Sequence, residues 1–175
     1  MYKRQMLLER GADVTCRDDR GVSALDYVIK KGLNIESATM LAKIGTEKGI
    51  MLSGMRRDQT EAKLGSQGLQ PADAILIVSD LQFMAVMTTL DLIHNNIGPE
   101  GAIAIAEALK VNAVLITLRL DKNKIGPEGA MAIAEALKVN AVLTFLSLRN
   151  NNFGDAGNKV LKDALRGRSG FVLEL

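Results

Sequence analysis

Hydrophobic and polar residues follow two alternating patterns along the second half of the chain. In residues 118–120, Leu-Arg-Leu, apolar and polar side chains alternate, which predicts a short strand with one buried face. From Ala102 to Leu109 the apolar residues recur at spacings of three and four, which predicts a helix with one narrow apolar face. The pattern therefore predicts short strands that alternate with amphipathic helices.

The two patterns repeat every 28 residues. Residues 90–117 and 118–145 are identical at 21 of 28 positions, a third copy continues from Leu146, and a fainter copy precedes them at Leu64–Leu81. The chain ends in FVLEL, a further strand like Thr144–Leu148 but one residue early. Stacked copies of one strand–helix unit predict an α/β solenoid, with a parallel sheet inside and helices outside.

The ends of the repeated helices carry residues that suit them. Proline costs nothing at the first helical position, so we expect the helices to begin at Pro99 and Pro127. The first turns contain Glu100 and Glu128 and the last turns Lys110 and Lys138, which are the signs that the helix dipole favours. We expect Asn112 and Asn140 to end the helices in the left-handed conformation.

The segments LxxLxLxxN, at Leu115–Asn123 and Leu143–Asn151, resemble leucine-rich repeats. The 28-residue length and the GPEGAxAIAEAL helix are similar to the ribonuclease-inhibitor type. The resemblance implies about four repeats over residues 61–175 in a short right-handed solenoid. It also implies that Asn95, Asn123 and Asn151 bond the backbone of the loop after each strand. The same subclass occurs in cytosolic immune receptors, tropomodulin-like actin regulators and the Ran GTPase-activating protein.

The first third of the chain has a different pattern. Residues 7–32, LLERGADVTCRDDRGVSALDYVIKKG, resemble an ankyrin repeat, and a second helix is expected around Ile35–Ile44. We therefore assign residues 1–44 to a small α-helical, ankyrin-like segment and residues 45–60 to a junction, with a solvated turn at Arg56-Arg57. So few ankyrin units cannot bury their own apolar face. The segment packs against the leucine-rich repeats, is the tail of a longer array, or is poorly ordered; we favour a fragment that packs as well as it can.

Composition excludes several classes of protein. A net charge of +2 and 3% aromatic residues do not favour nucleic-acid binding. One cysteine and one histidine leave too few ligands for a Cys/His zinc site, and no cofactor is implied. No apolar run is long enough to span a membrane, and the N-terminus lacks the apolar core of a signal peptide. With a lone thiol at Cys16, these features favour the cytoplasm.

Catalytic patterns are also missing from the sequence. The glycines of Gly98-Pro99-Glu100-Gly101 suggest a phosphate loop, but no GxxxxGK[ST] occurs and Glu100 would repel a phosphate. We assign these glycines to turns and packing. His94 has no nucleophile at a meaningful spacing and is expected to be a solvated residue of the repeat face. The sequence therefore predicts a protein that is not an enzyme.

The two near-identical repeats differ mainly in and beside their strands. Five of the seven differences, among them Asp91/Arg119 and Thr117/Phe145, fall there, and only Ile103/Met131 lies in the helix. Variation on a constant scaffold favours a binding face over random drift, so we predict that a partner protein contacts the concave strand face. The predicted contact residues are Thr89, Asp91, Ile93, His94, Thr117, Arg119, Asp121, Lys122, Phe145, Ser147 and Arg149.

Several functions remain open at this point. The first is a non-enzymatic protein-interaction module in which Arg119, Phe145 and Arg149 act as anchors. The alternatives are a GTPase activator similar to the Ran-activating family, a ligand-sensing fragment of an immune-receptor-like protein, and an actin-binding protein like tropomodulin. The last strand is expected to be uncapped, and its free edge predicts self-association with another chain.

Overall fold

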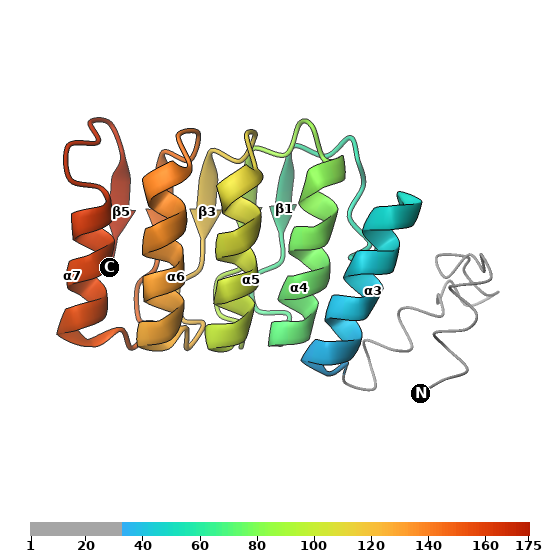
Figure 1. Ribbon diagram of the computed structural model, residues 1–175, viewed down its shortest axis with the longest axis horizontal. Helices are drawn as coiled ribbons and strands as arrows, with labels where there is room; N and C mark the ends of the chain where they lie inside the picture. Colours follow the sequence, from blue (N-terminus) through green and yellow to red (C-terminus); the bar gives the residue numbers. More distant parts are fainter. Residues whose placement is uncertain (1–32) are drawn as a thin grey trace.

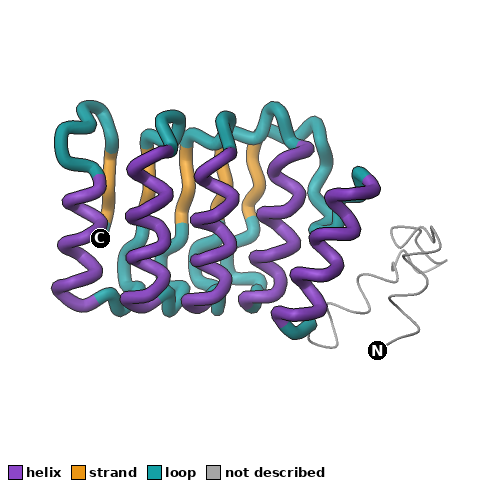
Figure 2. Tube along the Cα trace, viewed as in Figure 1, coloured by secondary structure: helices purple, strands orange, loops and turns teal. Residues whose placement is uncertain are grey.

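The computed structural model describes residues 33–175, which form two layers, strands on one side and helices on the other (Figures 1 and 2). The sheet has five parallel strands whose spatial order follows the sequence. This is the α/β solenoid that the repeat predicts. The strands are β1 (Glu61–Lys63), β2 (Thr89–Asp91), β3 (Thr117–Arg119), β4 (Phe145–Ser147) and β5 (Val172–Glu174). The helices are α3 (Ile35–Lys48), α4 (Pro71–Asp80), α5 (Gly98–Val111), α6 (Gly126–Val139) and α7 (Gly154–Ala164), with a 3-10 turn η1 (Leu81–Phe83) after α4.

The central residue of each inner strand points into the core between the layers. Leu90, Leu118 and Leu146 are paired in register and have no exposed surface. Ile105 and Ile133 of the helices complete the same continuous core. Since each repeat places the same apolar residues at the same height, one core runs through all the units.

The last strand is shifted as the sequence predicts. Phe145 of β4 pairs with Val172 of β5, whereas every earlier pairing joins residues 28 apart, such as Thr117 with Phe145. The sequence FVLEL therefore pairs one residue early. Along residues 33–175, β5 is the last strand of the sheet.

The glycines of the repeated GPEG motif have the turn and packing roles that we expected. α5 and α6 begin at Gly98 and Gly126, one residue before the predicted prolines, and both glycines have a left-handed φ of 65° and 68°. At Gly101 a methyl group would lie 2.6 Å from a side-chain carbon of Ile97. The motif therefore turns the chain and lets each helix pack closely.

The predicted left-handed helix stops at Asn112 and Asn140 are wrong. Both residues have an extended backbone, with φ of −75° and −76°. Their side chains end the helices instead: Asn112 Oδ1 accepts hydrogen bonds from the backbone N–H groups of Val114 and Leu115 at 3.1 and 2.8 Å. Side-chain bonds of asparagine compete with helical bonds, so the residue ends the helix without a positive φ.

The helix expected at Ile35–Ile44 is present as α3 and continues to Lys48. It ends at Gly49, which has a left-handed φ of 67°. α3 joins the outer helix layer beside α4 (Figure 1), and Ala38 packs with Ala72 and Leu76 of α4 in a separate small core. The ankyrin-like motif of residues 7–32, which includes Cys16, lies outside the described residues.

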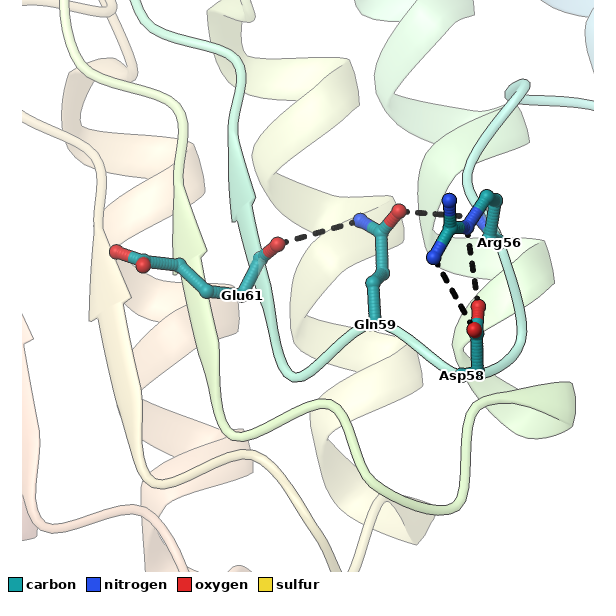
Figure 3. Close-up of polar contacts among 4 residues, drawn as sticks. All are labelled: Arg56, Asp58, Gln59 and Glu61. Carbon is teal, nitrogen blue, oxygen red and sulfur yellow. Dashed lines mark hydrogen bonds and ion pairs between the residues drawn. The ribbon is translucent and has the colours of Figure 1, made fainter.

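Residues 45–60 contain the exposed turn expected at Arg56-Arg57. Figure 3 shows Arg56 of this turn with its polar contacts. The Arg56 guanidinium pairs with the Asp58 carboxylate at 3.1 Å, and both side chains are exposed. The side-chain hydrogen bond from Arg56 holds the pKa of Asp58 below its ordinary value. Gln59 accepts from the Arg56 backbone N–H at 3.0 Å and donates to the Glu61 carbonyl at 3.4 Å, which connects the turn to β1.

Candidate partner-binding face

The predicted contact residues of β2, β3 and β4 form rows across the sheet. Here "sheet face" means the side of the sheet opposite the helices. Strand pairing aligns Thr89, Thr117 and Phe145 in one row. It aligns Asp91, Arg119 and Ser147 in the next. Because side chains alternate along a strand, these residues lie opposite the buried leucines.

The centre of the sheet face pairs a guanidinium with an aromatic ring. The Arg119 guanidinium carbon lies 5.7 Å from the centre of the Phe145 ring, within the range of a cation–π contact. Arg119 is exposed, whereas Phe145 is half-buried. Among residues 33–175 no carboxylate lies within ion-pair distance of Arg119. Within this part of the chain its charge is therefore not neutralised by a carboxylate.

Ser147 differs from its neighbours because it is only 3% exposed. Its hydroxyl donates to Asp121 Oδ1 at 2.7 Å. The second carboxylate oxygen, Asp121 Oδ2, is buried without a hydrogen-bond partner in the structure. Ser147 therefore orients Asp121 and contributes little surface of its own.

The side chains of Arg149, just after β4, and Asp91, at the end of β2, also bond to other parts of the protein. Arg149 forms an ion pair with Glu174 of β5 at 2.8 Å. Asp91 Oδ1 accepts from the backbone N–H of Ile93 at 3.0 Å, which closes the turn after β2. Along these strands Arg149 is thus paired with Glu174, and the carboxylates of Asp91 and Asp121 are each held by a hydrogen bond.

The rim of the sheet face is formed by residues with a left-handed backbone. His94, Lys122 and Asn150 have φ of 58°, 54° and 59°, and all three are exposed. The His94 N–H donates to the Asp121 carbonyl at 2.8 Å, so the ladder continues past the strand. The His94 ring lies 3.4 Å from the Ser66 hydroxyl. His94 is therefore a solvated rim residue, as the sequence predicts.

The three asparagines behind the rim form the expected ladder. Asn123 has no exposed surface, and its amide nitrogen donates to the carbonyls of Leu92 and Leu120 at 2.8 and 3.1 Å. Asn151 repeats the pattern with Leu120, and its Oδ1 accepts from the Asn123 N–H at 2.8 Å. Each amide links two repeats, so these residues stabilise the scaffold and do not form a chemical site.

Asp80 was not among the predicted functional residues, although its side chain joins Leu52 and Ser53 to the repeats. This carboxylate is 1% exposed and accepts from the backbone N–H groups of Leu52 and Ser53 at 2.8 and 2.7 Å. Burial raises its pKa, and the hydrogen bonds from Ser53 and Leu52 oppose the shift. One clue was available: alanines stand at the equivalent positions of the later repeats, Ala108, Ala136 and Ala164.

Within positions 33–175 no three His, Cys, Asp or Glu side chains gather as metal ligands. None of the helices described is long and apolar enough to cross a membrane.

Comparison with known families identifies the repeat. Residues 84–106, 111–134 and 139–161 each match the model of a leucine-rich repeat. The chain contains leucine-rich repeats. The matched segments include β2, β3 and β4, the strands that carry the sheet face.

Comparison with known proteins confirms the fold. A solved structure of leiomodin-1, described as its actin-binding site 2, superposes with a TM-score of 0.62 and 20% identity over 82% of this chain and 79% of that one. No curated protein matches the sequence significantly. The likeness supports an α/β leucine-rich-repeat solenoid.

Proposed function

We propose that this chain is a non-enzymatic interaction module that binds a partner protein on the concave face of its strands. The observation that carries the proposal is the Arg119 guanidinium held above the Phe145 ring. Arginine and aromatic side chains dominate the energetics of protein interfaces. The ring pre-orients the guanidinium, so less side-chain entropy is lost when a carboxylate binds it.

The internal comparison of repeats supports the same face. Arg119 and Phe145 stand where the preceding repeat has Asp91 and Thr117, although the helices between them are almost identical. A partner that carries a carboxylate beside an apolar group would fit the pair. Thr89, Ile93 and Lys122 then form the surrounding contacts, and Arg149 is available once it leaves Glu174.

The proposal is tested by affinity capture from source-cell lysate with the Arg119→Ala/Phe145→Ala/Arg149→Ala variant. A double variant of the helix layer, Met131→Ala/Val139→Ala, is the matched control because both residues are exposed on α6. We expect a partner that is held by the wild type and the control and lost by the triple variant, with unchanged circular dichroism. Equal capture by the folded triple variant would contradict the placement.

Actin is the first defined partner to test. The leiomodin-1 structure is named for an actin-binding site, and an actin-binding role like that of tropomodulin is one of the open functions. Co-sedimentation with filaments, repeated with the triple variant, separates binding at the sheet face from binding elsewhere. A pellet free of this chain at micromolar actin would remove actin from consideration.

Two alternative functions require separate assays. A GTPase activator similar to the Ran-activating family predicts faster phosphate release from a panel of small GTPases. A ligand-sensing fragment of an immune-receptor-like protein predicts a ligand but no catalytic effect.

We further propose that the repeats belong to the ribonuclease-inhibitor subclass, because their period is 28 residues. We assign ankyrin-like character to residues 1–44 and a junction to residues 45–60. The lone cysteine supports residence in the cytoplasm.

Self-association through β5 is a separate proposal. In the described part of the chain no strand covers the outer edge of β5, and Val172 is exposed there. An unpaired edge offers backbone groups to another strand. Sedimentation over a range of concentrations, with Leu173→Pro as the variant, would detect pairing at this edge.

A further inference from the structure

The cationic side chains of residues 61–150 differ in whether a carboxylate of this chain neutralises them. Some pair with a glutamate: Lys63, Lys110, Lys138 and Arg149. The others are exposed and form no ion pair with any residue from 33 to 175: Arg119, Lys122 and Lys124. These three residues, named here the β3 cation patch, follow one another from the end of β3 into the loop that leads to α6.

The preceding repeat lacks this charge although its sequence is nearly identical. The positions of the three cations are occupied there by Asp91, His94 and Asn96. With Asp121 included and histidine neutral, the formal charge changes from −1 in residues 91–96 to +2 in residues 119–124. The helices that follow carry the same charges in both repeats. A change in charge confined to the sheet face and its rim indicates electrostatic complementarity with a partner.

The two lysines of the patch have a backbone conformation that suits asparagine better. Lys122 and Lys124 have a left-handed φ of 54° and 56°. One repeat later, Asn150 and Asn152 occupy the same positions, each with a φ of 59°. Because asparagine tolerates this region more readily, the fold does not require lysine at either position. Unfavourable backbone conformations cluster at functional sites, which agrees with a role for the two ammonium groups.

We propose that the β3 cation patch binds an acidic segment of the partner protein, in which glutamate or aspartate residues alternate with apolar ones. The inference rests on the proposed function, because Arg119 belongs both to the patch and to the anchor of the sheet face. The Phe145 ring beside Arg119 supplies the apolar contact. Residues 119–124 span at most about 18 Å, a length that about five extended residues or about three turns of helix cover.

Carboxylates around the patch favour a short acidic segment over a long polyanion. Asp91 is paired in register with Arg119 across the sheet. Glu100 and Glu128 lie in the first turns of α5 and α6, the helices that follow the loops of the rim. Nucleic acids bind through many phosphate contacts along their backbone. Such a backbone would meet these carboxylates as soon as it extended beyond the patch.

Fluorescence anisotropy with a synthetic peptide tests the charge of the ligand. The probe is a fluorescein-labelled acidic peptide, GEELEELEEG, and the control is its neutral counterpart, GQQLQQLQQG. We expect the wild type to bind the acidic peptide at low salt and to bind it more weakly as salt is added, because ions screen exposed charges. No binding at millimolar concentrations of the chain, or equal binding of the two peptides, would overturn the proposal.

Two variants with the same loss of charge test the location. Lys122→Asn/Lys124→Asn copies the residues of the next repeat, so it should fold, which thermal unfolding checks. Lys159→Gln/Lys162→Gln removes two exposed charges from α7 and is the matched control. The first variant should weaken binding about tenfold, as expected for two exposed ion pairs, and the control by less than about twofold. Equal losses would show a general effect of net charge and contradict the site.

NMR locates the peptide without any substitution. On titration with the acidic peptide, the backbone amide resonances of residues 119–124 should shift most. The same loop in the neighbouring repeats, residues 91–96 and 147–152, is the internal control. Larger shifts in either control loop or in α7 would overturn the proposal. Oligothymidylate replaces the peptide in a parallel titration; tighter binding than the peptide's, lost in the lysine variant, would reassign the patch to nucleic acid.

Affinity capture separates this inference from the proposed function. If Lys122→Asn/Lys124→Asn retains a partner that Arg119→Ala/Phe145→Ala/Arg149→Ala loses, the sheet face binds the partner and the inference about the acidic segment is wrong. If the lysine variant loses the acidic peptide while the triple variant still captures the partner, the patch binds acidic segments and the proposed placement of the partner is wrong.

Discussion

The side-chain amide of Asn123 donates to the carbonyl of Leu92 at 2.8 Å, across the boundary between two repeats. The backbone of the loop after each strand is thus bonded by a side chain at the point where strand pairing ends. Side chains that replace lost backbone bonds fix the geometry of a buried loop.

Replacing Asn123 with alanine should therefore lower the free energy of unfolding by about 3 kcal/mol or more, because several buried backbone groups lose their partner. Urea unfolding followed by circular dichroism measures the change. The control is Asn96→Ala, whose amide donates to the exposed Gln70 side chain. This variant should stay within about 0.5 kcal/mol of the wild type. Equal losses in the two variants would argue against the ladder as a main source of stability.

We expect that even a methyl group at Gly129 lowers the stability of the protein. A methyl there would lie 2.9 Å from the Ala102 side chain and closer still to Ile125. Gly129→Ala should cost about 1–3 kcal/mol through overpacking, although alanine is the better helix former. Thermal unfolding checks this, with Met131→Ala on the exposed face of the same helix as the control. A stabilised Gly129→Ala variant would show that the helices can separate without cost.

Lys124 is predicted to be a site of stored backbone strain. It is exposed and has a left-handed φ of 56°, which asparagine tolerates better than lysine. Asn152 occupies the equivalent position with a φ of 59°. Lys124→Asn should raise the free energy of unfolding by about 0.5 kcal/mol. Lys138→Asn, in the last turn of α6, should have the opposite sign because it weakens the helix and its ion pair with Glu135. A loss at both sites would contradict the strain.

Asp80 should give the stability a specific pH dependence. Burial raises its pKa above the ordinary value of 3.8, so the folded state holds the proton more tightly than the unfolded state does. Its contribution to stability is therefore complete below pH 3.8 and decreases as the pH rises through the folded pKa. The stability advantage of the wild type over Asp80→Asn, measured as a difference in unfolding free energy, should therefore decrease as the pH rises from 3.8 through the folded pKa of Asp80. A carboxyl NMR titration with a pKa below 3.8 would show that the donors Leu52 and Ser53 outweigh burial.

The periodic part of the fold could be predicted because one local pattern is copied. The buried leucines of β2, β3 and β4 follow from the 28-residue period, and the role of the asparagine ladder follows from the resemblance to leucine-rich repeats. The shifted register of β5 was predictable for the same reason, since a one-residue offset is visible in the sequence.

The parts that could not be predicted depend on what breaks the period. Asn112 ends α5 through its side chain, and propensity cannot distinguish this from a left-handed stop. The burial of Ser147 follows from its bond to Asp121, which lies 26 residues away. The placement of α3 beside α4, where Ala38 packs with Leu76, is specified by no repeat in the sequence.

The asparagine bonds have a consequence for how this protein can change in length. Asn123, Asn151 and their partners are separated by fixed intervals of 26, 28 and 31 residues. A whole unit gained or lost between Ile97 and Ile125 would leave every interval intact, because each new amide meets the same carbonyls. A deletion of any other size in this segment would leave a buried side-chain amide without its hydrogen-bond partners. The molecule is therefore built to lengthen in discrete steps, and unequal recombination between its two near-identical repeats would produce such steps without a folding defect.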